Sequence, residues 1–130
     1  MIIVGGTYSE ICFEPISEDI FGSGLRAVSL VLENNNTEDL IFYTCADEEV
    51  QNHLNYYTNI YSSLTVITEQ VFESPKFHYD FPLKTPSIFP RPDLYRDVDV
   101  LLETKGDNIL VFGLLEASII NAPTLPRGQV

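Results

Sequence analysis

Basic residues are scarce in this 130-residue chain. Seven lysines and arginines stand against 19 aspartates and glutamates, which gives a formal net charge of −12 at pH 7. Phosphate backbones and anionic membrane surfaces repel so acidic a protein. We therefore expect neither a nucleic acid nor a membrane as a partner, and we assign the aromatic residues at 77, 79 and 81 to packing or to a lid or dimer contact rather than to base stacking.

Long apolar runs and a charged-then-apolar leader are also missing. A bilayer span needs roughly 20 apolar residues in a row, and no segment approaches that length. We expect a cytoplasmic protein. The only two cysteines, Cys12 and Cys45, lie in strand-like apolar surroundings, which favours small buried side chains over a disulfide, a ligand or a nucleophile. His53 and His78 have no partner at ligand spacing, so no metal site is predicted.

Two common nucleotide-binding motifs do not occur. The chain has no Gly-x-x-x-x-Gly-Lys-Ser/Thr loop, and Gly22-Ser23-Gly24 is not followed by the third glycine of a Gly-x-Gly-x-x-Gly fingerprint. This turn opens directly into an apolar helix. Because glycine lets the backbone approach a ligand closely, N–H groups at the helix start can face hydroxyl oxygens. The turn therefore favours binding of a compound with hydroxyl groups over binding of a phosphate.

Charge is unevenly distributed along the chain. Residues 1–75 hold 12 acids and one base, a balance of −11, whereas residues 76–130 hold seven acids and six bases, a balance of −1. Arg26 is the single base of the first part, and it lies near the predicted N-terminus of a helix, where the macrodipole disfavours a cation. We expect an anionic group to compensate it, and either a surface ion pair or a ligand fits that expectation.

Hydrophobic periodicity predicts strands that alternate with two helices. Strands are expected at residues 1–5, 8–13, 39–45, 63–72, 77–81, 98–102 and 109–115, and helices at 24–32 and 47–60. Four prolines in residues 82–92 exclude a helix interior or a central strand there, so we expect an extended connector. The order of the elements indicates an α/β or α+β sandwich.

Several of these segments, taken together, resemble the N-terminal part of the ribokinase-like (PfkB) family of carbohydrate and nucleoside kinases. The likeness lies in the first strand with Gly5-Gly6, in the Gly22-Ser23-Gly24 turn, in Thr44-Cys45-Ala46-Asp47, which is similar to a Gly-x-Asp segment, and in the strand that ends at Glu116. It implies an α/β, ribokinase-like three-layer sandwich, N-terminal portion only, with a β-rich lid-like segment. The substrate-side region would span residues 1–120, followed by a loose tail at 121–130.

The resemblance also implies a set of substrate-binding residues. By it, Glu10 binds substrate hydroxyls, Gly22, Ser23 and Gly24 form the acceptor platform, and Glu116 is a hydroxyl or metal-side acid. A complete family member uses ATP and magnesium, for which this chain offers no cofactor-binding residues that we can name. Ser23 stands where the family has glycine. The family's second motif, Gly-Ala-Gly-Asp, which forms the anion hole and supplies the catalytic base, does not occur.

The resemblance points to a partial carbohydrate kinase domain. We expect it to bind a sugar or nucleoside whose hydroxyl accepts phosphate from ATP, to contain no catalytic or metal residue of its own, and to be inactive alone. The alternative is a non-catalytic ligand-binding or protein-interaction module that retains the sheet. In that alternative a homodimer would form through the lid or through an exposed strand edge.

Overall fold

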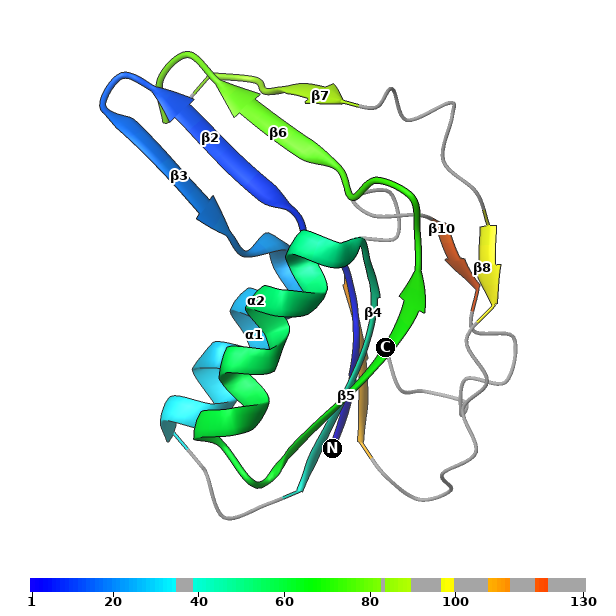
Figure 1. Cartoon of the computed structure of the whole chain (residues 1–130). Coiled ribbons are helices and arrows are strands. Elements are labelled where there is room, and N and C mark those ends of the chain that lie inside the picture. The colour runs from blue at the N-terminus through cyan, green and yellow to red at the C-terminus, as the bar shows by residue number, and fades with distance from the viewer. Residues whose placement is uncertain (35–38, 83, 90–96, 100–107, 113–118, 122–130) are drawn as a thin grey trace.

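The structure is a computed structural model of the chain and describes residues 1–34, 39–82, 84–89, 97–99, 108–112 and 119–121. These residues form a mixed α/β structure with two four-stranded sheets, a short two-stranded sheet and two helices (Figure 1). The mixed α/β class predicted from the sequence is confirmed.

A parallel sheet forms the centre of the described structure. Its strands are, in spatial order, β5 (Leu64–Gln70), β4 (Leu40–Ala46), β1 (Ile2–Val4) and β9 (Ile109–Val111). All neighbouring strands run parallel, with Ile3 opposite Phe42 on one side and opposite Leu110 on the other. β1 is short, yet it is paired on both sides, so it fixes the register of the sheet.

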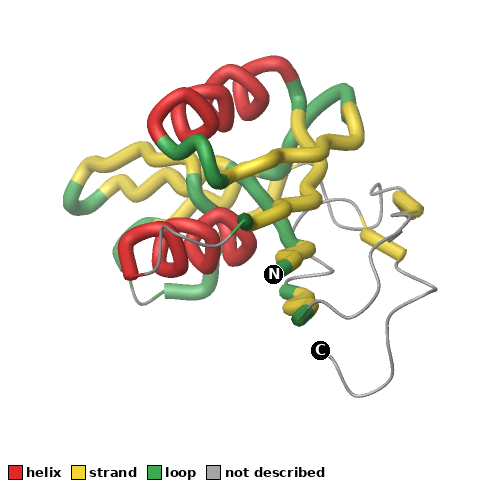
Figure 2. The backbone as a smooth tube through the Cα atoms, turned by 90° about the horizontal axis from the view of Figure 1, so that it is seen from below, coloured by secondary structure: helices red, strands yellow, loops and turns green. Residues whose placement is uncertain are grey.

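Both helices cover one face of this sheet. α1 (Gly22–Asn34) connects the second sheet to β4, and α2 (Glu48–Ile60) connects β4 to β5; both lie on the same side of the strands (Figure 1, Figure 2). Leu25, Val28 and Leu54 are fully buried against Ile3 and Phe42. Each fully buried apolar side chain of this size stabilises the fold by roughly 1.5–3 kcal/mol, so this layer is the main core.

The opposite face of the parallel sheet is buried as well. Ile2 and Val4 have no exposed surface, and Cys45 and Ile109 are only 2% exposed. Burial on both faces explains why β1 and β4 are apolar almost throughout rather than alternating. Cys45 is the small buried residue that the sequence predicts, whereas Cys12 is partly exposed.

The second sheet extends beyond the carboxyl end of β1. Its spatial order is β3 (Ile16–Ile20), β2 (Ser9–Phe13), β6 (Lys76–Tyr79) and β7 (Ser87–Phe89). β2 and β3 form an antiparallel hairpin, β6 adds parallel to β2, and β7 adds antiparallel to β6. The hairpin is inserted between β1 and α1, so the second sheet projects from the end of the core where β1 ends and α1 begins (Figure 1).

Three strands were not predicted. β3 lies in a segment that the sequence left unassigned, and β7 lies inside the proline-rich connector, where it occupies the sheet edge that proline tolerates. β10 (Ile119–Asn121) pairs with β8 (Asp97–Asp99) in the short parallel sheet and falls where the predicted domain meets the predicted tail. The remainder of that tail lies outside the described residues.

Two backbone segments touch where α1 begins. Gly24 lies directly against Gly5, and the Gly24 N–H donates a hydrogen bond to the Gly6 carbonyl at 3.0 Å. A Cβ on Gly24 would lie 2.7 Å from the Gly5 carbonyl carbon, and one on Gly5 would lie 2.8 Å from the Gly24 Cα. Gly22 has a φ of 83°, which other residues rarely adopt. These glycines let the helix start against the end of β1.

Gly24→Ala should destabilise the protein by roughly 1–3 kcal/mol, because the added methyl group must push two backbone segments apart. Urea denaturation followed by far-UV circular dichroism measures this. Leu30→Ala on the same helix is the control, since Leu30 is 60% exposed, and it should change stability by less than about 0.5 kcal/mol. A Gly24→Ala protein that gains the roughly 1 kcal/mol typical of alanine in a helix interior would contradict the close packing.

Candidate functional site

A groove lies on one face of the second sheet, beside the first turns of α1. Its volume is about 310 Å³. On β2 and β3, Glu10 lies opposite Asp19 and Cys12 lies opposite Ser17. On β6, Tyr79 lies beside Cys12. Because side chains alternate between the two faces of a sheet, this register places all five on one face. Arg26 reaches the same groove from α1.

Arg26 and Glu10 form a bidentate ion pair in this groove. Arg26 Nη1 donates to Glu10 Oε1 at 2.6 Å and Nη2 donates to Oε2 at 2.5 Å. The Glu10 side chain is 19% exposed and that of Arg26 is 54% exposed. Such parallel hydrogen bonds are the strongest form of this pair. The anionic group expected to compensate Arg26 is therefore Glu10.

The environment keeps Arg26 charged. The hydrogen bonds that Arg26 donates to Glu10 raise the pKa of Arg26, and the negative charge of Glu10 adds to this against the opposing effect of partial burial. The guanidinium also lies 5.2 Å from the centre of the Phe21 ring, in a cation–π contact. The cation of the groove is thus held by a carboxylate on β2 and an aromatic ring just before α1.

Gly22 and Gly24, predicted to form an acceptor platform with Ser23, have a defined role in the fold. The Gly24 N–H is donated to Gly6, so this group is engaged within the protein rather than facing a ligand. Gly22 allows the reversal that leads from β3 into α1. Their substrate contacts stay a prediction. What the structure shows is that the turn positions Arg26, less than one helical turn later, over the groove.

Of the five predicted site residues, the structure brings Glu10 close to the turn at 22–24 through its bond to Arg26. Glu116 lies outside the described residues. Sequence reasoning missed Asp19 and Ser17 because β3 was not recognised. A hairpin reading of residues 9–20, with its turn at Glu14-Pro15, would have placed Asp19 opposite Glu10.

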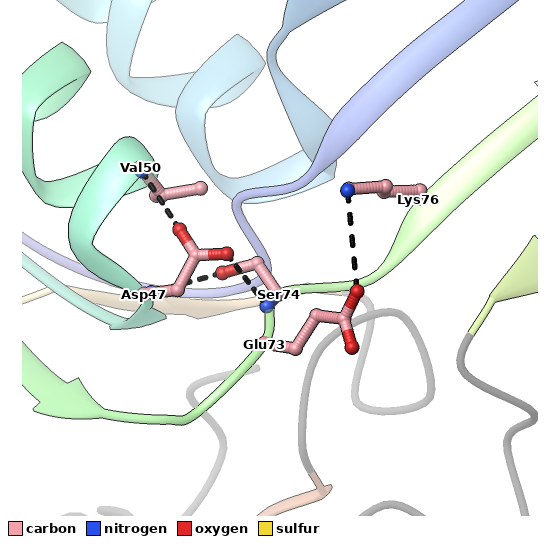
Figure 3. A network of polar contacts seen from close by, with 5 residues as sticks. All are labelled: Asp47, Val50, Glu73, Ser74 and Lys76. Carbon is pink, nitrogen blue, oxygen red and sulfur yellow. Dashed lines mark hydrogen bonds and ion pairs between the residues drawn. The ribbon is translucent and has the colours of Figure 1, made fainter.

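A second polar cluster surrounds Asp47, at the carboxyl end of β4 (Figure 3). Asp47 caps α2, since Oδ1 accepts from the Val50 N–H at 2.9 Å, while Oδ2 accepts from the Ser74 N–H at 2.9 Å. The Asp47 N–H in turn donates to Ser74 Oγ at 3.0 Å. Both carboxylate oxygens are therefore engaged in joining the start of α2 to the segment between β5 and β6. The Gly-x-Asp-like segment has a structural role here.

A smaller cavity of about 280 Å³ lies beside this cluster, lined by Gln51, Asn52, Thr68 and Gln70 as well as Asp47. Thr68 donates to Gln51 Oε1 at 2.7 Å, and Gln51 donates to Asn55 at 3.1 Å. The Gln51 amide is thus bonded within the protein through both its oxygen and its nitrogen. The groove at Glu10 is the better candidate, because it combines both signs of charge, hydroxyl groups and an aromatic wall.

The groove is suited to hydrogen bonding with hydroxyl groups. An ionised carboxylate has about four lone-pair sites, and the two bonds from Arg26 leave Glu10 able to accept from a ligand. Asp19 and Ser17 are exposed at its rim. Among the residues that the structure describes, no three histidine, cysteine or acidic side chains gather as a metal site would require.

Comparison of the chain with protein-family models, with curated proteins and with solved structures gave no match. Within the described segments, none of the helices has the length and apolar character needed to cross a bilayer.

Asp47→Ala should destabilise the protein by about 2 kcal/mol or more, because it removes an N-cap worth roughly 1 kcal/mol and leaves the Ser74 N–H without its acceptor. Asp47→Ser is the informative partner variant. It keeps one oxygen for the cap and loses the bond to Ser74, so its loss should be about half as large. Thermal and urea denaturation measure the stability of both variants. Equal losses of stability would contradict separate contributions from the cap of α2 and from the bond to Ser74.

Proposed function

We propose that the groove binds a sugar or nucleoside through its hydroxyl groups, as the acceptor side of a ribokinase-like (PfkB) domain. The observation that carries the proposal is the position of the Glu10 carboxylate, held by Arg26 at the junction of the second sheet and α1. The second sheet would act as the lid. The turn at Gly22, Ser23 and Gly24 fixes the angle at which α1 meets this lid.

The structural basis for hydroxyl binding is a set of acceptors on one face of two paired strands. Glu10 and Asp19 lie directly opposite each other, with Ser17 two residues from Asp19 along β3. Two carboxylates and a hydroxyl on one face of the sheet offer several acceptors to the hydroxyl groups of a single ligand. Tyr79 lines the groove beside them. Hydrogen bonds to charged groups contribute roughly 1.5–3 kcal/mol each, which is enough to set specificity.

In this proposal the chain positions the acceptor hydroxyl and the phosphoryl donor belongs elsewhere. The family resemblance implies ATP and magnesium, and among the described residues no three histidine, cysteine or acidic side chains gather to hold the metal. Glu10 and Asp19 would orient the acceptor, and positioning of this kind is a large part of phosphoryl-transfer catalysis.

A thermal-shift screen of the purified protein against sugars and nucleosides tests the proposal. A ligand at a hundredfold excess over its Kd adds about 2.7 kcal/mol, which for a domain of this size raises Tm by roughly 5–15 °C. For a ligand that raises Tm, Asp19→Asn should increase the Kd roughly tenfold or more. Glu18→Gln is the matched control, because Glu18 is the neighbouring acid on the opposite face of β3. No Tm shift with any compound, or equal effects of both variants on binding, would count against the groove as the binding site.

A second candidate function, a protein-interaction module, is favoured by the other face of the second sheet. Phe13 and Ile16 face each other across the hairpin and are 57% and 90% exposed, and Phe89 on β7 is 56% exposed. His78 stacks on Phe13 with ring centres 6.1 Å apart. Exposed apolar side chains gathered on a sheet face are typical of an interface, and we propose a second copy of the chain as its partner.

Light scattering after size-exclusion chromatography tests the dimer. If this face mediates it, the wild-type protein should elute as a dimer at tens of micromolar, and Ile16→Asp should shift it to a monomer. Tyr56→Asp is the control, since Tyr56 is 70% exposed on α2 and lies outside the sheet. A monomeric wild type excludes a second copy of the chain as the partner of this face.

A further inference from the structure

We infer that the groove selects uncharged or positively charged polyhydroxyl compounds and rejects their phosphorylated or carboxylated forms. This inference rests on the proposed function, because it names the charge class of the ligand at the same groove. It comes from the balance of ionic groups around Glu10, Asp19 and Arg26.

The cation of the groove is already neutralised. Both Arg26 nitrogens that carry the ion pair are bound to Glu10, one to each carboxylate oxygen. A ligand phosphate that bound the remaining N–H groups of Arg26 would lie beside this carboxylate, which is attached to a strand and only 19% exposed. An anion at Arg26 therefore meets a cation whose charge is already offset, since the repulsion of Glu10 opposes the attraction of the guanidinium.

Asp19 is the ionic group of the groove that lies outside the Arg26–Glu10 ion pair. It lies directly opposite Glu10 in the antiparallel hairpin, and like charges in such a position destabilise the pairing. Arg26 compensates one of the two carboxylates. The three ionic side chains thus sum to one net negative charge, at the exposed rim through which a ligand would enter.

The other described bases do not offset this charge. Lys84 pairs with Asp80 at 2.8 Å, and Lys76 lies 3.9 Å from Glu73. Each lysine and arginine of the segments that the structure describes is thus beside an acid. The surplus of acids in residues 1–75 adds a longer-range field of the same sign. Near and far charges both oppose an anionic ligand.

Three matched pairs of compounds test the inference by calorimetry or thermal shift: glucose and glucose 6-phosphate, ribose and ribose 5-phosphate, and adenosine and adenosine 5′-monophosphate. Whichever neutral member binds, its phosphate should bind at least roughly tenfold more weakly. Glucosamine should bind at least as tightly as glucose. The discrimination should shrink between 50 and 500 mM salt, because exposed charges are screened.

Two lysine variants locate the source of the discrimination. Asp19→Lys should abolish or reverse the preference for the neutral compound, whereas Glu18→Lys changes the chain's net charge equally on the opposite face and should preserve it. Similar effects of the two would overturn the inference, as would a phosphate that binds the wild type as tightly as its neutral partner. In that last case the proposed hydroxyl-binding function stands. Absence of binding by all the compounds overturns both.

Discussion

The backbone contact between Gly5 and Gly24 is the constraint on which the rest of the structure depends. It joins the end of the central strand to the start of α1 with no side chain between them. The hydrogen bond from Gly24 to Gly6 completes the contact. Because β1 is paired with a strand on each side, this contact fixes the position of α1 relative to the whole parallel sheet. Any side chain at either glycine would have to separate the two elements.

The position of the groove follows from this contact. The chain leaves β1, forms the β2–β3 hairpin and returns to α1 within about 18 residues, so the hairpin must stand at the carboxyl end of the sheet. Arg26 comes two residues after the fixed glycine and meets Glu10, two residues into β2. The ion pair therefore links the second sheet to the helix core. Parallel α/β sheets place their ligands at this end.

The sequence made the parallel core predictable but not the shape of the second sheet. Apolar runs identified β1 and β4, and the Asp47 cap with its helical spacing identified α2, since burial and capping leave strong local patterns. β3 left no such pattern, because four of its five residues are exposed and only pairing with β2 defines it. Asp19 was missed for the same reason. The glycine turn was recognised, although its close partner proved to be the backbone at residues 5 and 6 rather than a ligand.

Arg26 contributes little to stability but much to the charge of the groove. It is more than half exposed, and an ion pair in such a place contributes at most about 1 kcal/mol to folding. Its pairing nevertheless sets the ionic character of the groove, since it removes one positive charge and one negative charge from what a ligand meets. The acid that remains, Asp19, is the group on which the proposed rejection of anions depends. A groove that holds a cation need not be a site for anions, because the partner of that cation decides what it can still bind.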